Sequence, residues 1–253
     1  MSIQYVTVEE AIPRAGLRMV VVANAPSPWG EAAKEFFRIK GLDYVAVRLV
    51  YDNDALARWA GQLSGPVVVY NEEPPRSGWA EILMLAEQLA PSPPLLSLEP
   101  NARGRALALA NDFCSEHGLG WTRRQQLVHA SLTLNTGFSA QAAGYLGKKY
   151  GYDPARADTY GPRVRELLGK CAAALRTAGG EYYHGATFGA VDIYSAAFMA
   201  LFKPLPEAVC AMHARARAAF EWLDDETRAA LDPILIEHRD RMYARHLETP
   251  LSL

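Results

Sequence analysis

The stretch LRMVVVANAPSPWGEAAKEFFRIKG, residues 17–41, passes from a valine-rich run through a proline-containing turn into an amphipathic run. The run at 17–23 is typical of a fully buried strand. Residues 31–40 place Ala33, Phe36 and Phe37 at helical spacing, and Gly41 follows as a residue that ends helices. This stretch therefore predicts a buried strand, a short turn and a helix.

The flanking segments continue the alternation of strand and helix. Tyr44–Val50 predicts a second strand, Asn53 caps a further helix, and Val67–Tyr70 predicts a third strand before a helix over Trp79–Leu89. A strand, a crossover helix and a second strand imply a parallel pair. Residues 4–8 alternate apolar and polar side chains, which is compatible with an added edge strand.

The second half of the chain is predicted to be helical. A proline-rich linker, Pro91-Ser-Pro-Pro94 with Pro100 beyond it, cannot be helical and marks the predicted domain boundary. We expect an α/β domain over residues 1–95, with 1–16 as an N-terminal extension, and an all-α bundle of five to seven helices over 96–253. Helical periodicity recurs at 107–113, 123–133, 140–150, 160–177, 190–202 and 227–247.

Composition narrows the class of protein. Half of the 253 residues are hydrophobic and 21% are charged, as in globular rather than disordered chains. The net charge of −2 gives no strong field to attract nucleic acid or an anionic membrane. No run is long and apolar enough to cross a bilayer, and residues 1–16 lack the apolar core of a secretory signal. Cys114, Cys171 and Cys210 are odd in number and far apart, which favours a cytoplasmic location over a disulfide framework.

The turn after the first predicted strand brings Ser27 to the start of a helix. Unpaired main-chain N–H groups favour negative charge there, and a thiol near such a terminus can have its pKa lowered from about 8.5 toward about 7. Ser27 could donate a hydrogen bond to a bound thiolate, or it could serve only as the helix N-cap with Pro28 at the first position. Pro66 leaves a similar choice open, because its peptide bond could be cis or trans.

The order and spacing of these motifs resemble those of a cytosolic glutathione transferase. The segments SPW, AAK and IKGLDY, at residues 27–29, 32–34 and 39–44, are similar to the family's Ser-Pro turn, first helix and entry to the second strand. The segment GPVV at residues 65–68 resembles its cis-proline segment. Gly185 with Val191-Asp192-Ile193 resembles the capping motif of its helical domain. The resemblance extends from residue 17 to about residue 202.

The resemblance implies a thioredoxin-like domain that holds glutathione and a helical domain that supplies a pocket for a small apolar electrophile. By position, Ser27 would stabilise the glutathione thiolate, and Gly65 would offer main-chain hydrogen bonds to its cysteinyl part. The resemblance also implies glutathione as co-substrate, no metal, and a homodimer. The other residues predicted at the glutathione site are Pro28, Trp29, Pro66, Ser77, Gly78 and Trp79. Phe113 and Trp121 are predicted at the second-substrate pocket, although tryptophans often serve core packing instead.

Two positions depart from the family's pattern. The family has Glu-Ser at the start of the third helix, gripping the γ-glutamyl end of glutathione, where Gly78 and Trp79 stand in this chain with Ser77 just before them. Gly189 replaces an expected capping Ser or Thr, although Asp192 is kept. The first departure leaves two hypotheses open. One is a glutathione-dependent enzyme, and the other is a non-enzymatic protein of the same fold that binds a hydrophobic ligand or a partner.

The C-terminal segment is predicted as one long amphipathic helix over 231–247, followed by the mostly apolar residues 250–253. Such an end is expected to dock on the protein. It could cover the second-substrate pocket, or it could pack on the bundle for stability alone.

Overall fold

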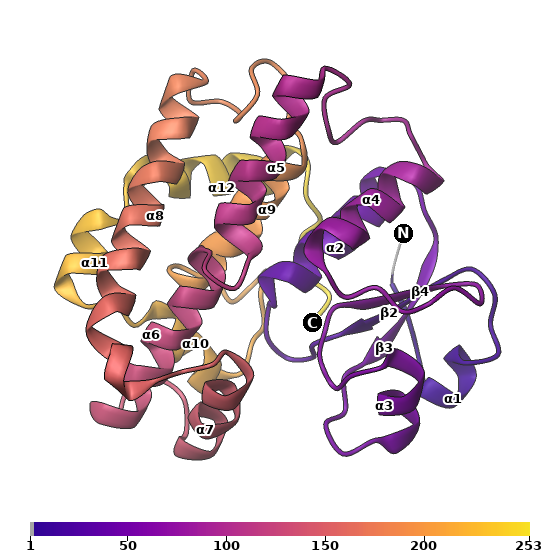
Figure 1. Ribbon diagram of the computed structural model, residues 1–253, viewed down its shortest axis with the longest axis horizontal. Helices are drawn as coiled ribbons and strands as arrows, with labels where there is room; N and C mark the ends of the chain where they lie inside the picture. The colour runs from indigo at the N-terminus through magenta and orange to yellow at the C-terminus, as the bar shows by residue number, and fades with distance from the viewer. Residues whose placement is uncertain (1–2) are drawn as a thin grey trace.

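A small sheet with helices on both faces forms the first half of the chain, and a helical bundle stands beside it (Figure 1). Figure 1 shows a computed structural model that describes residues 3–253, so Met1 and Ser2 of the predicted N-terminal extension lie outside the described residues. The elements of the first half are β1 (Gln4–Val6), α1 (Val8–Ala11), β2 (Leu17–Val21), α2 (Pro28–Ile39), β3 (Tyr44–Arg48), α3 (Asp54–Ala60), β4 (Val67–Tyr70) and α4 (Trp79–Leu89).

The four strands pair in the order β1-β3-β2-β4. Strands β2 and β3 are parallel, with Met19 opposite Ala46, whereas β4 runs antiparallel to β2. β1 adds to β3 in parallel at one edge, so the edge strand compatible with the alternation at residues 4–8 is confirmed. Beyond β4, the turn over residues 71–78 returns only far enough for an isolated bridge between Val68 and Arg76.

Alternating side chains of the strands enter two separate hydrophobic clusters. Met19 and Val21 point into the large cluster shared with α2, α4 and the helical half, whereas Val20 points into a smaller one with α1 and α3. Figure 1 accordingly shows α2 and α4 on one face of the sheet and α1 and α3 on the other. Each fully buried aliphatic or aromatic side chain stabilises the fold by roughly 1.5–3 kcal/mol. Because both faces are covered, all five residues of β2 are buried, Arg18 included, without the alternation of a half-exposed strand.

The second half is helical, as predicted. Its elements are α5 (Pro100–Cys114), α6 (Leu119–Thr133), α7 (Ala140–Lys149), a 3-10 turn (Pro154–Arg156), α8 (Ala157–Thr177), α9 (Ala190–Phe198), a second 3-10 turn (Met199–Leu201), α10 (Ala214–Glu221), α11 (Asp225–Ala230) and α12 (Pro233–Arg245). Helix α9 is buried along its whole length and contacts α2, α5 and α12. It is therefore the element through which the two halves pack.

The long helix predicted over 231–247 is found as α12, but the helical periodicity over 227–247 belongs to two helices rather than one. The chain breaks between α11 and α12, where the Asp232 carboxylate accepts a hydrogen bond from the main-chain N–H of Ile234 and Pro233 takes the first helical position. An N-cap followed by proline starts a new helix rather than continuing the old one. Helix α10 was not predicted at all.

Gly189 begins α9 without a side-chain cap, and Asp192 takes over that role. One carboxylate oxygen of Asp192 accepts the Gly189 N–H at 2.8 Å. The other accepts the main-chain N–H of Tyr183 and lies 2.9 Å from Nε2 of His238, and both side chains of this last pair are fully buried. Asp192 thereby ties the start of α9 to α12.

The segment between α4 and α5, residues 90–99, contains neither helix nor strand. It is nonetheless hydrogen-bonded to both halves of the molecule. From the first half, the Lys40 ammonium donates to the carbonyls of Ala90 and Pro93. From the second half, the Ala190 N–H donates to the Leu95 carbonyl. Residue 95 thus lies in an irregular segment, and its assignment as a domain boundary stays a prediction.

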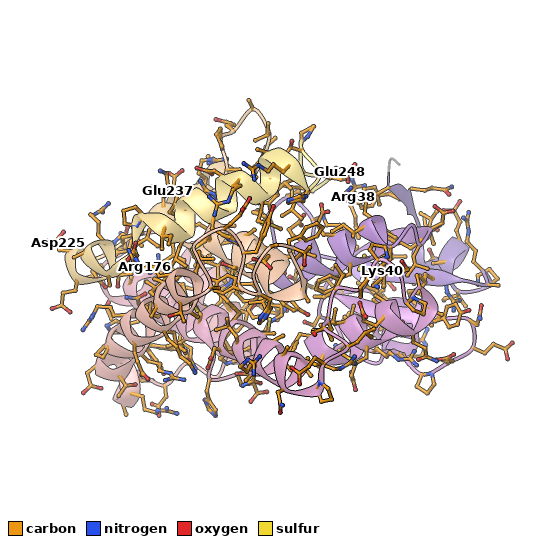
Figure 2. The ribbon with its side chains drawn as sticks, turned by 90° about the horizontal axis from the view of Figure 1, so that it is seen from above. Arg38, Lys40, Arg176, Asp225, Glu237 and Glu248 are labelled. Atoms are coloured by element: carbon orange, nitrogen blue, oxygen red, sulfur yellow. The ribbon has the colours of Figure 1, made fainter. Side chains whose placement is uncertain are left out.

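The C-terminal segment docks, as predicted, and it contacts both halves: the Leu251 N–H donates to the Val209 carbonyl, and further bonds reach the first half. The Ser252 carbonyl accepts hydrogen bonds from Tyr5 in β1 and Lys34 in α2, and the Glu248 N–H donates to Glu35. In Figure 2, Glu248 and Arg38 lie close together at this junction, where the Arg38 guanidinium also donates to the His246 carbonyl. None of the described helices is long and apolar enough to cross a membrane.

Candidate functional site

A cavity of about 600 Å³ opens between the two halves of the molecule. One wall comes from the first half: the start of α2, the connection from α3 to β4, and the start of α4. The other wall comes from α5, α6 and α7. The lining residues are Trp29, Gln62, Leu63, Ser64, Gly65, Pro66, Ser77, Gly78 and Trp79 on the first wall, and Cys114, Ser115, Glu116, Trp121, Tyr145, Lys149 and Tyr150 on the second.

Gly65 and Pro66 form the part of the first wall that leads into β4. The peptide bond between them is cis. A Cβ atom on Gly65 would lie 3.3 Å from the Val22 nitrogen and 3.4 Å from the Val20 oxygen, so a side chain here would crowd β2. The wall therefore presents main chain rather than side chain at this point.

The start of α4 forms another part of the same wall. Gly78 is the N-cap of α4, and Ser77 and Trp79 line the cavity beside it. The exposed Glu81 carboxylate accepts the Gly78 N–H at 3.0 Å. The remaining N–H groups of the first turn have no partner within the helix, which makes this end favourable for an anion. The indole of Trp79 packs edge-on against Tyr194, whose hydroxyl donates to the Trp79 carbonyl at 3.0 Å.

Trp29 and Trp121 stand on opposite walls of the cavity. The Trp29 indole N–H donates to the Cys114 carbonyl at 2.9 Å, which joins the start of α2 to the end of α5. The Trp121 indole N–H donates to the Tyr150 carbonyl at 2.8 Å, and its ring packs edge-on against the Tyr150 ring at a centroid distance of 4.8 Å. These bonds fix both indoles against the backbone, so their faces form rigid apolar surfaces.

Lys149 is the one lysine or arginine that lines this cavity among the described residues. Its side chain is half-buried at the end of α7, and burial together with the nearby Arg124 lowers its pKa from 10.5 to about 8. Arg124, in α6, is buried, and burial lowers its pKa as well. Glu116 also lines this wall and is exposed.

Comparison with known proteins identifies the architecture. No family model and no curated protein matches the sequence. Among solved structures, a glutathione S-transferase from Methylobacillus flagellatus with glutathione bound is 14% identical, with a TM-score of 0.64 over 91% of this chain and 96% of that chain. One from Methylobacterium radiotolerans in complex with glutathione sulfonate is 19% identical, with a TM-score of 0.60 over 94% and 98%. Glutathione transferase Omega 3C from Trametes versicolor is 15% identical, with a TM-score of 0.58 over 94% and 89%.

The chain has the glutathione transferase fold. The predicted thioredoxin-like half and helical half are thus confirmed as the two parts of this fold. Six of the residues predicted for the glutathione site line the first wall of the cavity: Trp29, Gly65, Pro66, Ser77, Gly78 and Trp79.

Ser27 and Pro28 do not line the cavity. Ser27 is the N-cap of α2 and 8% exposed, Pro28 is buried at the first helical position, and the Ser27 hydroxyl makes no capping hydrogen bond. The Ser27 hydroxyl is thus not committed to its own helix. In this geometry Trp29 is the residue that carries the start of α2 to the cavity surface.

Of the two residues predicted for the second-substrate pocket, Trp121 lines the cavity and Phe113 does not. Phe113 is fully buried, with its ring packed against Tyr183 and Phe198. Helix α5 turns the Phe113 side chain into the core, whereas the next residue, Cys114, reaches the cavity. Phe113 therefore belongs to the packing between helices.

The thiol of Cys114 is not suited to act as a nucleophile. The residue is buried, and burial raises the pKa of the thiol well above its usual value. Since the thiolate is the reactive form, Cys114 is held in its unreactive state. Within residues 3–253, no group of three or more histidine, cysteine, aspartate or glutamate side chains could hold a metal ion.

Sequence reasoning missed most of the second wall, in particular Tyr145, Lys149 and Tyr150. These residues end a helix with the sequence Lys148-Lys149-Tyr150, which is typical of a solvated helix end. They line the cavity because α7 packs on α6, where an added Cβ atom on Gly147 would lie 3.5 Å from Cγ1 of Val128. Nothing in the local sequence indicates this long-range packing.

Proposed function

We propose that the protein is a glutathione-dependent transferase that activates the glutathione thiol for attack on an electrophile. The observation that carries this proposal is the first wall, which combines two helix N-termini with the main chain around cis-Pro66 at one cavity. Structures of this fold with glutathione bound support the same assignment. The predicted cytoplasmic homodimer, acting away from membranes and nucleic acid, stays part of the proposal.

The γ-glutamyl and cysteinyl parts of glutathione would both have partners on the first wall. The γ-glutamyl carboxylate would bind at the start of α4, where Ser77 lines the cavity beside the unpaired N–H groups of the first turn. The main chain at Gly65 and Pro66 would pair with the cysteinyl part. The thiol would then lie toward the start of α2, where the helix dipole favours the thiolate.

The thiolate is the nucleophile, and its carbon–sulfur bond to the electrophile forms as the leaving group or π-electron pair departs. Because Cys114 is buried in its thiol form, the nucleophile must enter with the ligand. We propose that Ser27 donates a hydrogen bond to this thiolate, which is supported by a hydroxyl with no capping bond. The main-chain N–H groups of α2 are the alternative donors.

Calorimetric titration with glutathione tests the proposal, together with the ultraviolet absorbance of the bound thiolate as a function of pH. We expect binding in the millimolar range or tighter and a bound thiol pKa below its free value of about 8.5. Ser27→Ala should raise the pKa of the bound thiol, with Ser97→Ala as a control at an exposed serine. An unchanged pKa would remove Ser27 from the mechanism, and no binding at all would remove the proposal.

A second candidate function is a non-enzymatic binder of a hydrophobic ligand or partner. The observation that favours it is the Glu81 carboxylate, which already occupies the Gly78 N–H and places a negative charge where a γ-glutamyl carboxylate would bind. The same titration with glutathione distinguishes the two candidate functions. A binder of apolar ligands would take up an apolar dye in the cavity and ignore glutathione.

A further inference from the structure

Lys149 on the second wall and the nearby buried Arg124 form no salt bridge with a carboxylate among residues 3–253. The Lys149 ammonium and the Arg124 guanidinium lie 5.7 Å and 5.9 Å from the centroid of the same Tyr150 ring. The charged group that acts on Lys149 is Arg124, and the polar neighbours of Arg124 are the phenols of Tyr150 and Tyr51. Two like charges thus share one small site.

This arrangement is costly unless an anion completes it. Arg124 is 7% exposed, and its Nε is buried without a hydrogen-bond partner. A buried charge is normally paired with an opposite one, because removal from water is expensive. Glu116, the carboxylate on the same wall, is exposed to solvent, where its field is screened. The missing negative charge is therefore not supplied by the wall itself.

We propose that the second substrate carries a carboxylate, which pairs with Lys149 against the Tyr150–Trp121 surface. This inference rests on the proposed function, because it assigns the second substrate of the same site. It replaces the purely apolar electrophile expected from the sequence with one that has an apolar body and an anionic end. The aromatic surface would hold the body, and the ammonium would hold the carboxylate.

The surroundings of Lys149 favour an anion over a cation. A neighbouring hollow shares Trp121, Lys149 and Tyr150 with the cavity. Its wall adds the basic residues Lys148 and Arg156, together with Arg163, which is paired with Glu166, while its one carboxylate is again Glu116. Such an excess of positive charge at the rim raises the local concentration of anionic ligands. The first wall, by contrast, lines the cavity with no charged side chain.

The test compares two thioethers of glutathione that differ in a single group. In one, the alkyl chain on sulfur ends in a carboxylate, and in the other it ends in the neutral primary amide. Several chain lengths are used so that the end group can reach Lys149. Both compounds share the glutathione part, so the amide reports on the first wall and the ratio of the two dissociation constants reports on Lys149.

For the unaltered protein we expect the carboxylate to bind about tenfold tighter than the amide at the best chain length. Lys149→Met should remove this preference and leave the affinity for the amide unchanged, whereas Lys149→Arg should keep the preference. Lys203→Met is the matched control, because Lys203 is exposed and lines neither the cavity nor the neighbouring hollow. The experiment varies Lys149 rather than Arg124, since replacing a buried arginine would test folding as much as binding.

The outcomes separate the two proposals. If the amide binds and the carboxylate binds no tighter at any chain length, the anionic substrate is ruled out while the glutathione site stands. A preference that survives Lys149→Met would also overturn the assignment, because another group would then hold the carboxylate. If neither compound binds, the proposed function fails, and this inference fails with it.

Discussion

The two walls of the cavity recognise ligands by different means. The first wall presents main chain at Gly65 and the helix start at Gly78, and no charged side chain lines it. The second wall presents side chains, among them Trp121 and Lys149. Main-chain groups fixed by a turn and a helix cannot change with a substitution, whereas side chains can. The first wall therefore suits the invariant part of a reaction, and the second suits the part that varies between substrates.

Both walls depend on helix α9, and Asp192 is the residue whose loss should have the largest effect. Its carboxylate accepts the N–H groups of Gly189 and Tyr183 and pairs with His238 in the core. Asp192→Ala would leave these groups buried without partners, so the free energy of unfolding should fall by about 3–5 kcal/mol. Thermal denaturation measures the loss.

The control for that variant is Glu237→Ala, at an exposed residue of α12 that is labelled in Figure 2. It should leave the melting temperature nearly unchanged. A melting temperature for Asp192→Ala equal to that of the control would mean that α9 does not need this network. The two walls would then not depend on α9 as a shared support.

Gly120 of α6 packs closely against Phe198 and against Trp29 of the first wall. A Cβ atom there would lie 2.3 Å from Cε1 of Phe198 and 2.9 Å from Cη2 of Trp29. Gly120→Ala should therefore destabilise the protein by about 1–3 kcal/mol through overpacking. It should also displace Trp29 and weaken glutathione binding at the first wall. Denaturant unfolding and calorimetry measure the two effects.

Gly144→Ala is the matched control, because its added Cβ atom would meet nothing within 4 Å. This exchange in helix α7 should be neutral, or stabilising by up to about 1 kcal/mol. If Gly120→Ala behaved in the same way, the close packing between Trp29 and Phe198 would not matter for stability.

The sequence predicts the first wall of the site better than the second. Turns and helix starts have local chemical requirements, so Gly65-Pro66 and the start of α4 could be read from glycine and proline positions. Side chains of the second wall enter the cavity only through the packing of α7 on α6. Lys149 has no local feature that separates it from the exposed Lys148, so the sequence did not indicate its role.

The errors in the helical half have similar causes. Phe113 and Cys114 are adjacent, and a difference of one helical position decides between core and cavity. The helical periodicity over 227–247 runs through Asp232-Pro233, so the break before α12 was not predicted. An N-cap followed by proline is nevertheless a local feature that marks the start of a helix. Local patterns thus defined the elements well, and long-range packing decided which faces of the helices line the site.

The preference of the second wall for a carboxylate should depend on pH. The pKa of Lys149 is about 8, lowered by burial and then by Arg124. A lysine is charged below its pKa, so the expected tenfold preference should be complete near pH ~7 and decline as the pH rises through ~8. The phenols of Tyr145 and Tyr150 also face this site, but their pKa values are raised, so they stay neutral there.

Calorimetric titration of the carboxylate and amide thioethers between pH ~6.5 and ~9.5 measures this dependence. The Lys149→Arg variant is the matched control, because arginine keeps its charge throughout and its preference should not change. A preference that stayed constant in both proteins would show that the charge on Lys149 is not what selects the carboxylate.

The smallest predicted effect concerns the one charge close to the first wall. The Glu81 carboxylate bonds to the Gly78 N–H and opposes a second carboxylate at the start of α4. Glu81→Gln keeps an acceptor for that N–H and removes the charge, so affinity for glutathione should rise about two- to fivefold, as expected for a charge at a helix terminus. Glu72→Gln, in the exposed turn before α4, should leave the affinity unchanged. A fall in affinity in Glu81→Gln would instead mean that the carboxylate itself binds the ligand, through the amino group of glutathione. The first wall would then recognise its ligand partly by a side chain, as the second wall does.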